Sequence, residues 1–259
     1  MKFFFALMLG ALFSLSNGAR AACNPCICGV GNGQPPPSEC QRPPIETEIP
    51  APTNPCLDAK EWRRPMCAFV QTNLQHFAWG YEHSLRNYTL AKQIAFSAKL
   101  PFDDDVLFAA SMLHDIGGFP AYEKPGVDHA VRSTEVIDPI LADVGFPMEK
   151  SDAVKIAILT HSYYNADAPK TAEAILLHDA DSLDFLGNVA VMRIFSIVGH
   201  EASIPTVKKA MGLLESLFLQ APKRIFSGFY ASELAKSRAL EMRQFLDRLK
   251  DETFLFGLP

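Results

Sequence analysis

The chain of 259 residues has no excess of positive charge: 24 Lys and Arg stand against 29 Asp and Glu, a net charge of −5. A protein whose main task is to bind nucleic acid carries a basic surface, so this balance argues against a nucleic-acid partner. Strand-like alternation of apolar and polar residues is nearly absent, which argues against a sheet-based fold. With 48% hydrophobic and 20% charged residues, the composition is that of a soluble globular protein.

Cysteine is absent after residue 67. The six cysteines of the chain are Cys23, Cys26, Cys28, Cys40, Cys56 and Cys67. In a secreted chain, an even and clustered set of cysteines predicts disulfides, and six of them allow fifteen pairings. Cys23, Cys26 and Cys28 could instead hold a metal or be redox-active. Because they lie in a segment rich in proline and glycine with no βαβ pattern, a structural disulfide role is favoured.

Residues 1–21 have the pattern of a secretory signal peptide. Lys2 provides a positive start, a short apolar core follows, and Ala19-Arg20-Ala21 has the small-x-small spacing of a cleavage site. The apolar run is short for a membrane span. We therefore expect cleavage after Ala21 and a secreted or periplasmic protein without a membrane span in its mature form. Two alternatives stay open: a lipoprotein attached through Cys23, although Arg20 stands where a lipobox has an aliphatic residue, and a retained N-terminal anchor.

Residues 22–56 are rich in proline and glycine. Proline removes backbone donors and glycine raises the entropy of the unfolded chain, so neither a helix nor a central strand is expected here. We interpret this stretch as an extended segment held to the body of the protein by its cysteines. The oligomeric state has no signature in the sequence.

From about residue 57 onward, apolar residues recur at steps of three and four, the spacing of one buried face of an α-helix. This periodicity predicts an all-α domain over residues 57–259, with roughly seven to nine helices. The expected helices cover residues 58–78, 83–100, 104–113, 128–141, 149–161, 171–198, 206–219 and 231–252. Pro65 is expected to break or restart the first helix. Asp103 or Asp104 is expected to cap the third helix, and Asp128 the fourth. Residues 171–198 are almost entirely apolar, which predicts one long central helix.

His114 and Asp115 close an apolar helix and are followed by a glycine pair. Adjacent histidine and aspartate side chains offer a neutral nitrogen and an anionic oxygen to one point, which suits a divalent cation. Such a pair recurs by chance, but four more potential ligands flank it in the chain: His83, His129, His161 and Asp181. Asp181 lies inside an apolar helix, where a buried carboxylate needs a cation or many hydrogen bonds. We therefore expect these six residues to meet in a metal site, in which Asp115 could bridge two ions about 3.5–4 Å apart.

At these residues the chain resembles the HD superfamily of metal-dependent hydrolases. The resemblance covers roughly residues 75–200. It rests on the order His83, His114-Asp115, Asp181 and on the strings EHSLR (82–86), AASMLHDIG (109–117), ILTHS (158–162) and DADSLD (179–184). It implies an all-helical core, an ion such as Mn, Fe or Zn, and usually phosphoester hydrolysis. The additional His129 and His161 resemble the subset of this family with a second metal position.

Two features depart from the common pattern of that family. Many members carry a lysine soon after the dipeptide, where this chain has Gly118 and Phe119. The EHSLR string also resembles the cyanamide-hydratase-like branch, which adds water to a nitrile carbon. The metal site is therefore better supported than the substrate.

The sequence thus favours a hydrolase that uses metal-activated water on a small, nucleotide-like phosphoester. Asp115 or Asp184 is expected to handle the proton, and Lys124, with Arg132 and Arg193, to orient an anionic substrate. A cyanamide- or nitrile-hydratase-like lyase and a non-catalytic ligand-binding module are the alternatives. Asp179 competes with Asp181 as a ligand, but residues two apart on a helix point to opposite faces, and the family string favours Asp181. Three histidines are expected to be structural: His76, His178 and His200.

Overall fold

The computed structural model describes residues 54–57, 60–162 and 167–253. Within these ranges the chain forms only helices, so the expected all-α fold is confirmed. The α-helices are α2 Arg63–Asn73, α3 Tyr81–Ala98, α4 Asp104–Leu113, α5 His129–Asp143, α6 Ser151–Leu159, α7 Ala172–Asp184, α8 Gly187–Ser196, α9 Val207–Gln220 and α10 Phe229–Glu252. Short 3-10 turns are η4 Pro55–Leu57, η5 Ile116–Gly118, η6 Met148–Lys150 and η7 Ala221–Arg224. The expected signal peptide and nearly all of the Cys/Pro-rich segment lie outside the described residues.

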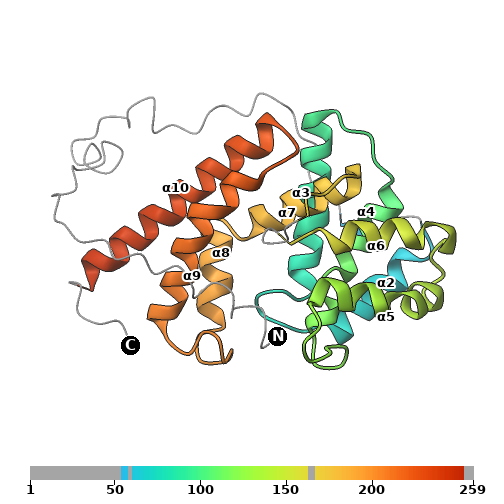
Figure 1. The fold of residues 1–259 in the computed structure, drawn as a ribbon, viewed down its shortest axis with the longest axis horizontal. Coiled ribbons are helices and arrows are strands. Elements are labelled where there is room, and N and C mark those ends of the chain that lie inside the picture. The colour runs from blue at the N-terminus through green and yellow to red at the C-terminus, as the bar shows by residue number, and fades with distance from the viewer. Residues whose placement is uncertain (1–53, 58–59, 163–166, 254–259) are drawn as a thin grey trace.

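The helices form two groups along the molecule (Figure 1). Helices α2 to α6 gather at one end, α8 to α10 lie at the other, and α7 runs between them beside α3. Helix α4 is the centre of the first group, since every residue from Val106 to Leu113 is buried. The HD dipeptide that follows α4 is therefore delivered into the interior of the bundle.

Side-chain caps start several helices where the sequence predicts them. Asp103, rather than Asp104, caps α4 by accepting hydrogen bonds from the N–H groups of Asp105 and Val106. Asp128 caps α5 in the same way. A capping carboxylate satisfies amide groups that the first helical turn leaves without partners, and it suits the positive end of the helix dipole.

The single long helix expected over residues 171–198 is wrong, whereas the expectation for Pro65 agrees with the structure. Residues 171–198 form two helices, because Gly187 adopts a φ of +75° and its missing side chain leaves room for Arg238 of α10. Apolar composition encodes burial but contains no signal for this break. Helix α2 begins at Arg63, so Pro65 lies in its first turn, where the helix needs no amide donor, and the helix starts beside this proline as one of the two expectations had it.

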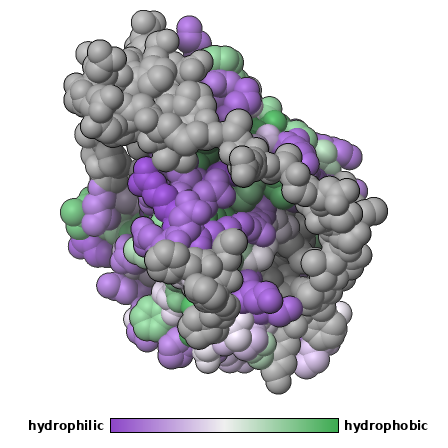
Figure 2. Space-filling model, turned by 90° about the vertical axis from the view of Figure 1, so that its left-hand side faces the viewer, coloured by the Kyte–Doolittle hydropathy of each residue, from purple (hydrophilic) through white to green (hydrophobic). Residues whose placement is uncertain are grey.

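Helix α10 covers one side of the C-terminal group with a single apolar face. Its buried residues Ala231, Ala235, Met242 and Leu246 recur at helical spacing. On the face of the molecule shown in Figure 2, hydrophilic residues predominate among the coloured ones. Among the described helices, none has both the length and the apolar composition that a membrane crossing requires.

A disulfide between Cys56 and Cys67 joins η4 to α2. It holds the start of the described chain against the bundle, as expected for a cysteine-rich segment. The other four cysteines lie outside the described residues, so their pairing stays a prediction.

Candidate metal centre

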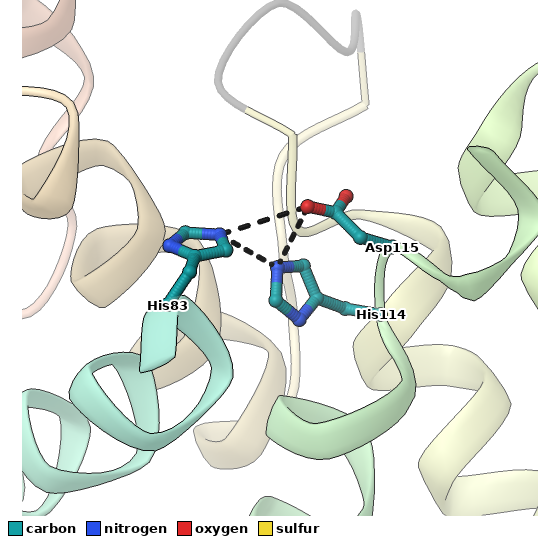
Figure 3. Close-up of side chains that lie close together, drawn as sticks. All are labelled: His83, His114 and Asp115. Atoms are coloured by element: carbon teal, nitrogen blue, oxygen red, sulfur yellow. Dashed lines mark hydrogen bonds and ion pairs between the residues drawn. The ribbon is translucent and has the colours of Figure 1, made fainter. Parts of the chain in front are cut away.

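Asp115 lies at the centre of the site, with each of its carboxylate oxygens facing a different pair of histidines. Oδ2 lies 3.6 Å from Nε2 of His83 and 3.4 Å from Nε2 of His114, and these three side chains converge in Figure 3. Oδ1 lies 3.5 Å from Nε2 of His129 and 3.6 Å from Nε2 of His161. The carboxylate is thus placed to be shared between two neighbouring groups of ligands.

Asp181 joins the first of these groups. Its Oδ1 lies 3.2 Å from Nε2 of His83 and 4.0 Å from Nε2 of His114. We call His83, His114, Asp181 and Oδ2 of Asp115 subsite A. Subsite B consists of His129, His161 and Oδ1 of Asp115. All six side chains that the sequence singles out therefore meet in one place, and their role as metal ligands stays a prediction.

The six residues reach this place from helix ends and from one helix interior. His83 lies in the first turn of α3, His129 begins α5, and Asp181 comes from within α7. Close packing of η5 on α5 brings the two subsites together. A Cβ on Gly117 would collide with the backbone of His129 and Ser133, and the Ser133 hydroxyl donates a hydrogen bond to the carbonyl of His114.

Each histidine is anchored through Nδ1, which fixes the direction of Nε2. His114 Nδ1 donates to the Ser111 carbonyl at 2.9 Å, and His161 Nδ1 donates to the Ile158 carbonyl at 2.6 Å. Nδ1 of His83 lies 2.7 Å from a carboxylate oxygen of Asp184, and Nδ1 of His129 lies 3.5 Å from Asp128. With the proton on Nδ1, the Nε2 lone pair is free to bind a metal.

Two close contacts test whether these residues suit a cation. Nε2 of His83 lies 3.2 Å from Nε2 of His114, and Nε2 of His129 lies 3.2 Å from Nε2 of His161. In both pairs the anchored Nδ1 leaves a lone pair on each Nε2, so two acceptors face one another. Such pairs need a cation or an extra proton between them. Imidazole nitrogens with carboxylate oxygens suit Zn²⁺, Fe²⁺ and Mn²⁺, so the residues present fit a divalent metal.

Comparison with known proteins agrees with this geometry. Residues 80–186 match the family model described as HD domain, and the matched range contains all six ligand candidates. An uncharacterized protein of Clostridium beijerinckii is 30% identical over 118 residues, which are 46% of this chain and 68% of that protein. The chain belongs to the HD superfamily. This superfamily fold supports a metal-dependent hydrolase in general terms.

Solved structures share the fold over about three quarters of the chain. A predicted HD superfamily hydrolase from an uncultured Thermotogales bacterium is 25% identical, with a TM-score of 0.51, over 73% of this chain and 91% of its own. Bacillus subtilis YpgQ, solved in complex with ADP, is 21% identical, with a TM-score of 0.53, over 73% of this chain and 96% of its own. An HD-superfamily hydrolase of Bacillus thuringiensis is 18% identical, with a TM-score of 0.51, over 74% and 97% of the two chains.

Electrostatics of the HD site favour cation binding. Burial opposes ionisation of Asp115, but the adjacent His114, His161 and His129 hold the pKa of its carboxyl well below the ordinary value. The pKa of Asp181 is likewise lowered, against the effect of burial, by His83 and His114. Both carboxylates therefore stay negatively charged inside the protein, where a cation would neutralise them.

Asp184 lies behind His83 and is held by two arginines. Its oxygens accept hydrogen bonds from Arg86 at 2.8 and 3.0 Å and from Arg193 at 2.7 Å. Burial opposes ionisation, but Arg193, His83 and Arg86 lower the pKa of Asp184 far below its ordinary value. The expectation that Arg193 orients substrate is wrong, because Arg193 is fully buried and also donates to the backbone of Ala78 and Asp184.

Lys124 and Arg132 lie on the outer side of the site. Lys124 is exposed between η5 and α5, and no described contact joins its ammonium group to either subsite. Arg132 donates to the carbonyl of Tyr122 at 2.6 Å and to Glu135 at 2.9 Å. Asp179, the rival of Asp181, accepts hydrogen bonds from the backbone of Phe226 and Ser227 and is structural.

Asn87, which no sequence pattern singled out, lies in subsite A. Its Nδ2 is 3.2 Å from Nε2 of His83 and 3.3 Å from Oδ1 of Asp181. The available signal was its spacing, since residues four apart on a helix lie on the same face. Asn87 is four residues after His83 in α3 and is fully buried.

Proposed function

We propose that this HD protein hydrolyses a small, nucleotide-like phosphoester with the help of two divalent cations. The observation that carries the proposal is the placement of the two Asp115 oxygens, each facing its own pair of histidine Nε2 atoms. Paired cations bridged in this way suit displacement at phosphorus, because the attacking and leaving oxygens both carry negative charge. The complex of the similarly folded YpgQ with ADP supports a phosphate-containing ligand.

The metal residues divide between binding and orientation. His83, His114 and Asp181 would hold one ion, and His129 with His161 the other, with Asp115 shared between them. A bound divalent ion supplies Lewis acidity and lowers the pKa of a coordinated water towards neutral. Asp115 is 9% exposed to solvent, the largest exposed fraction among the six candidate ligands. We therefore propose that substrate and water approach the site next to Asp115.

Asp184 is proposed to orient His83 and not to carry the proton, the role that the sequence had suggested. Its carboxylate is fully buried, faces the Nδ1 side of His83, and is already neutralised by Arg86 and Arg193. A carboxylate with a strongly lowered pKa is a poor base. It fixes the orientation of the His83 ring, as outer carboxylates do at other metal sites. The proton-handling role of Asp115 and the substrate-orienting role of Lys124 stay predictions.

A substrate panel tests the proposed activity. The mature protein is stripped of metal, reloaded with Mn²⁺, Zn²⁺ or Fe²⁺, and incubated with nucleoside phosphates, a generic aryl phosphate and cyanamide. Metal-dependent phosphate release that disappears in His114→Ala and persists in His200→Ala is the expected result. Consumption of cyanamide alone would identify a hydratase-like lyase, and tight nucleotide binding without turnover would identify a binding module.

We also propose that the protein is secreted or periplasmic. The signal-peptide pattern of residues 1–21 and the disulfide between Cys56 and Cys67 support this location, since disulfides persist in oxidising compartments. Expression of the full chain in a bacterium, followed by N-terminal sequencing of the periplasmic protein, is expected to show a chain that begins at Ala22. A cytoplasmic protein beginning at Met1 would contradict this location.

A further inference from the structure

The structure points to Asn87 as a further ligand of subsite A, and we propose that its amide oxygen binds the cation held there. This inference rests on the proposed two-cation function. The terminal Nδ2 lies 3.2 Å from Nε2 of His83, 3.5 Å from Nε2 of His114 and 3.3 Å from Oδ1 of Asp181. Asn87 therefore touches three of the four donor groups that define the subsite.

These distances match the spacing of ligands around a single ion. In an octahedral site with bonds of roughly 2.1 Å, neighbouring ligand atoms lie about 3 Å apart. His83 and His114 are separated by 3.2 Å, as are His83 and Asp181. The amide of Asn87 is spaced from these atoms as they are from each other, so it occupies the place of one more ligand.

The hydrogen bonds of the amide show which of its ends would face a cation. In the present placement Nδ2 points at Nε2 of His83 and His114, while the fully buried Oδ1 has no hydrogen-bond partner among the described residues. Once a cation takes the Nε2 lone pairs, an N–H group in this position would face positive charge. Oxygen and nitrogen of an amide are nearly identical in shape, so a half-turn of the amide puts Oδ1 there instead. The half-turn gives up the contact with Asp181, whose oxygen is by then bound to the same cation.

This ligand would make the two subsites unequal. Subsite B offers two imidazoles and one carboxylate oxygen among the described residues, whereas subsite A offers two imidazoles, two carboxylate oxygens and an amide oxygen. Amide oxygens suit six-coordinate ions such as Mn²⁺ better than Zn²⁺, which favours four ligands. Asn87 thus selects the metal of subsite A.

Titration calorimetry on the metal-free full-length protein tests this role. Replacement Asn87→Leu keeps the size of the side chain but removes the oxygen, and we expect about tenfold or greater loss of Mn²⁺ affinity at one of two sites. The Zn²⁺ affinity should change less. Replacement Asn87→Asp keeps an oxygen in the same place, so its Mn²⁺ affinity should equal or exceed that of the wild type.

Two outcomes would overturn the inference while leaving the metal site intact. Wild-type Mn²⁺ affinity in Asn87→Leu would show that the amide is not a ligand. Equal weakening in Asn87→Asp and Asn87→Leu would show that the N–H donor, rather than the oxygen, is what matters. If Asn87→Leu does not fold, the Asn87→Asp result decides alone. A wild-type protein that binds no metal would instead refute the proposed function itself.

Discussion

Nδ1 of His83 lies 2.7 Å from Oδ2 of Asp184, although 101 residues separate the two in the chain. The same carboxylate neutralises Arg86 and the fully buried Arg193. One side chain thus connects the candidate metal ligand His83 of α3 to the C-terminal group of helices. We therefore expect its charge to serve both the candidate metal site and the stability of the fold.

Replacement Asp184→Asn tests this double role. The amide keeps the shape but leaves the charge of Arg193 buried without its partner, so we expect the free energy of unfolding to fall by about 3–5 kcal/mol. Loss of the orienting carboxylate should also weaken metal binding by roughly 10–100-fold. Thermal unfolding and metal titration measure the two effects. The matched control is Asp138→Asn, which removes a partly exposed partner of Lys155 and should cost less than about 1 kcal/mol.

The sharing of Asp115 predicts how many ions each variant retains. His83→Ala should lose the ion of subsite A, His129→Ala should lose that of subsite B, and Asp115→Ala should lose both. Metal analysis after gel filtration measures the stoichiometry, with His200→Ala as an exposed histidine control. Two retained ions in Asp115→Ala would contradict the bridging arrangement.

Metal retention should depend on pH through His161. Burial opposes protonation of its imidazole, but Asp115 and Asp181 raise the pKa of His161 above its ordinary value of 6.5. A raised pKa stabilises the metal-free fold at low pH, and this contribution disappears as pH rises through the folded-state pKa. Cation binding instead becomes stronger as pH rises, because the ion must displace the proton on His161.

We therefore expect metal affinity to fall as pH decreases through the neutral range, while the metal-free protein loses the His161 contribution as pH increases. Equilibrium dialysis and thermal unfolding between roughly pH 5 and 8 compare the two forms. Metal affinity that is constant over this range would contradict a role for His161 as ligand.

Gly117 sets the distance between the HD turn and α5. Gly117→Ala would bring a Cβ into the backbone of His129 and Ser133, so we expect a loss of about 1–3 kcal/mol in unfolding free energy and a weakened subsite B. Gly212→Ala is the control, since a Cβ there meets nothing and helical alanine should stabilise by about 0.5–1 kcal/mol. Equal stability of the two variants, measured by denaturant unfolding, would show that η5 and α5 can move apart without cost.

Local chemistry explains which features the sequence was able to predict. Some features depend only on residues close together in the chain. These are the helical periodicity, the caps at Asp103 and Asp128, and the types of the candidate ligands. The break at Gly187 was missed because apolar composition shows only burial, whereas the positive φ of Gly187 and its closeness to Arg238, about fifty positions later, exist only in the folded chain.

By itself the sequence determined the helical architecture, the resemblance to the HD superfamily and the six candidate ligands, because residue type and spacing carry that information. Only the tertiary structure decided how the ligands divide between two subsites, since that depends on which way each Asp115 oxygen and each Nε2 points. It also turned Asp184 and Arg193 into a buried support for His83 and brought Asn87 into the same pocket. These contacts join α3, α7 and α8, and they are specified only when the helices pack together.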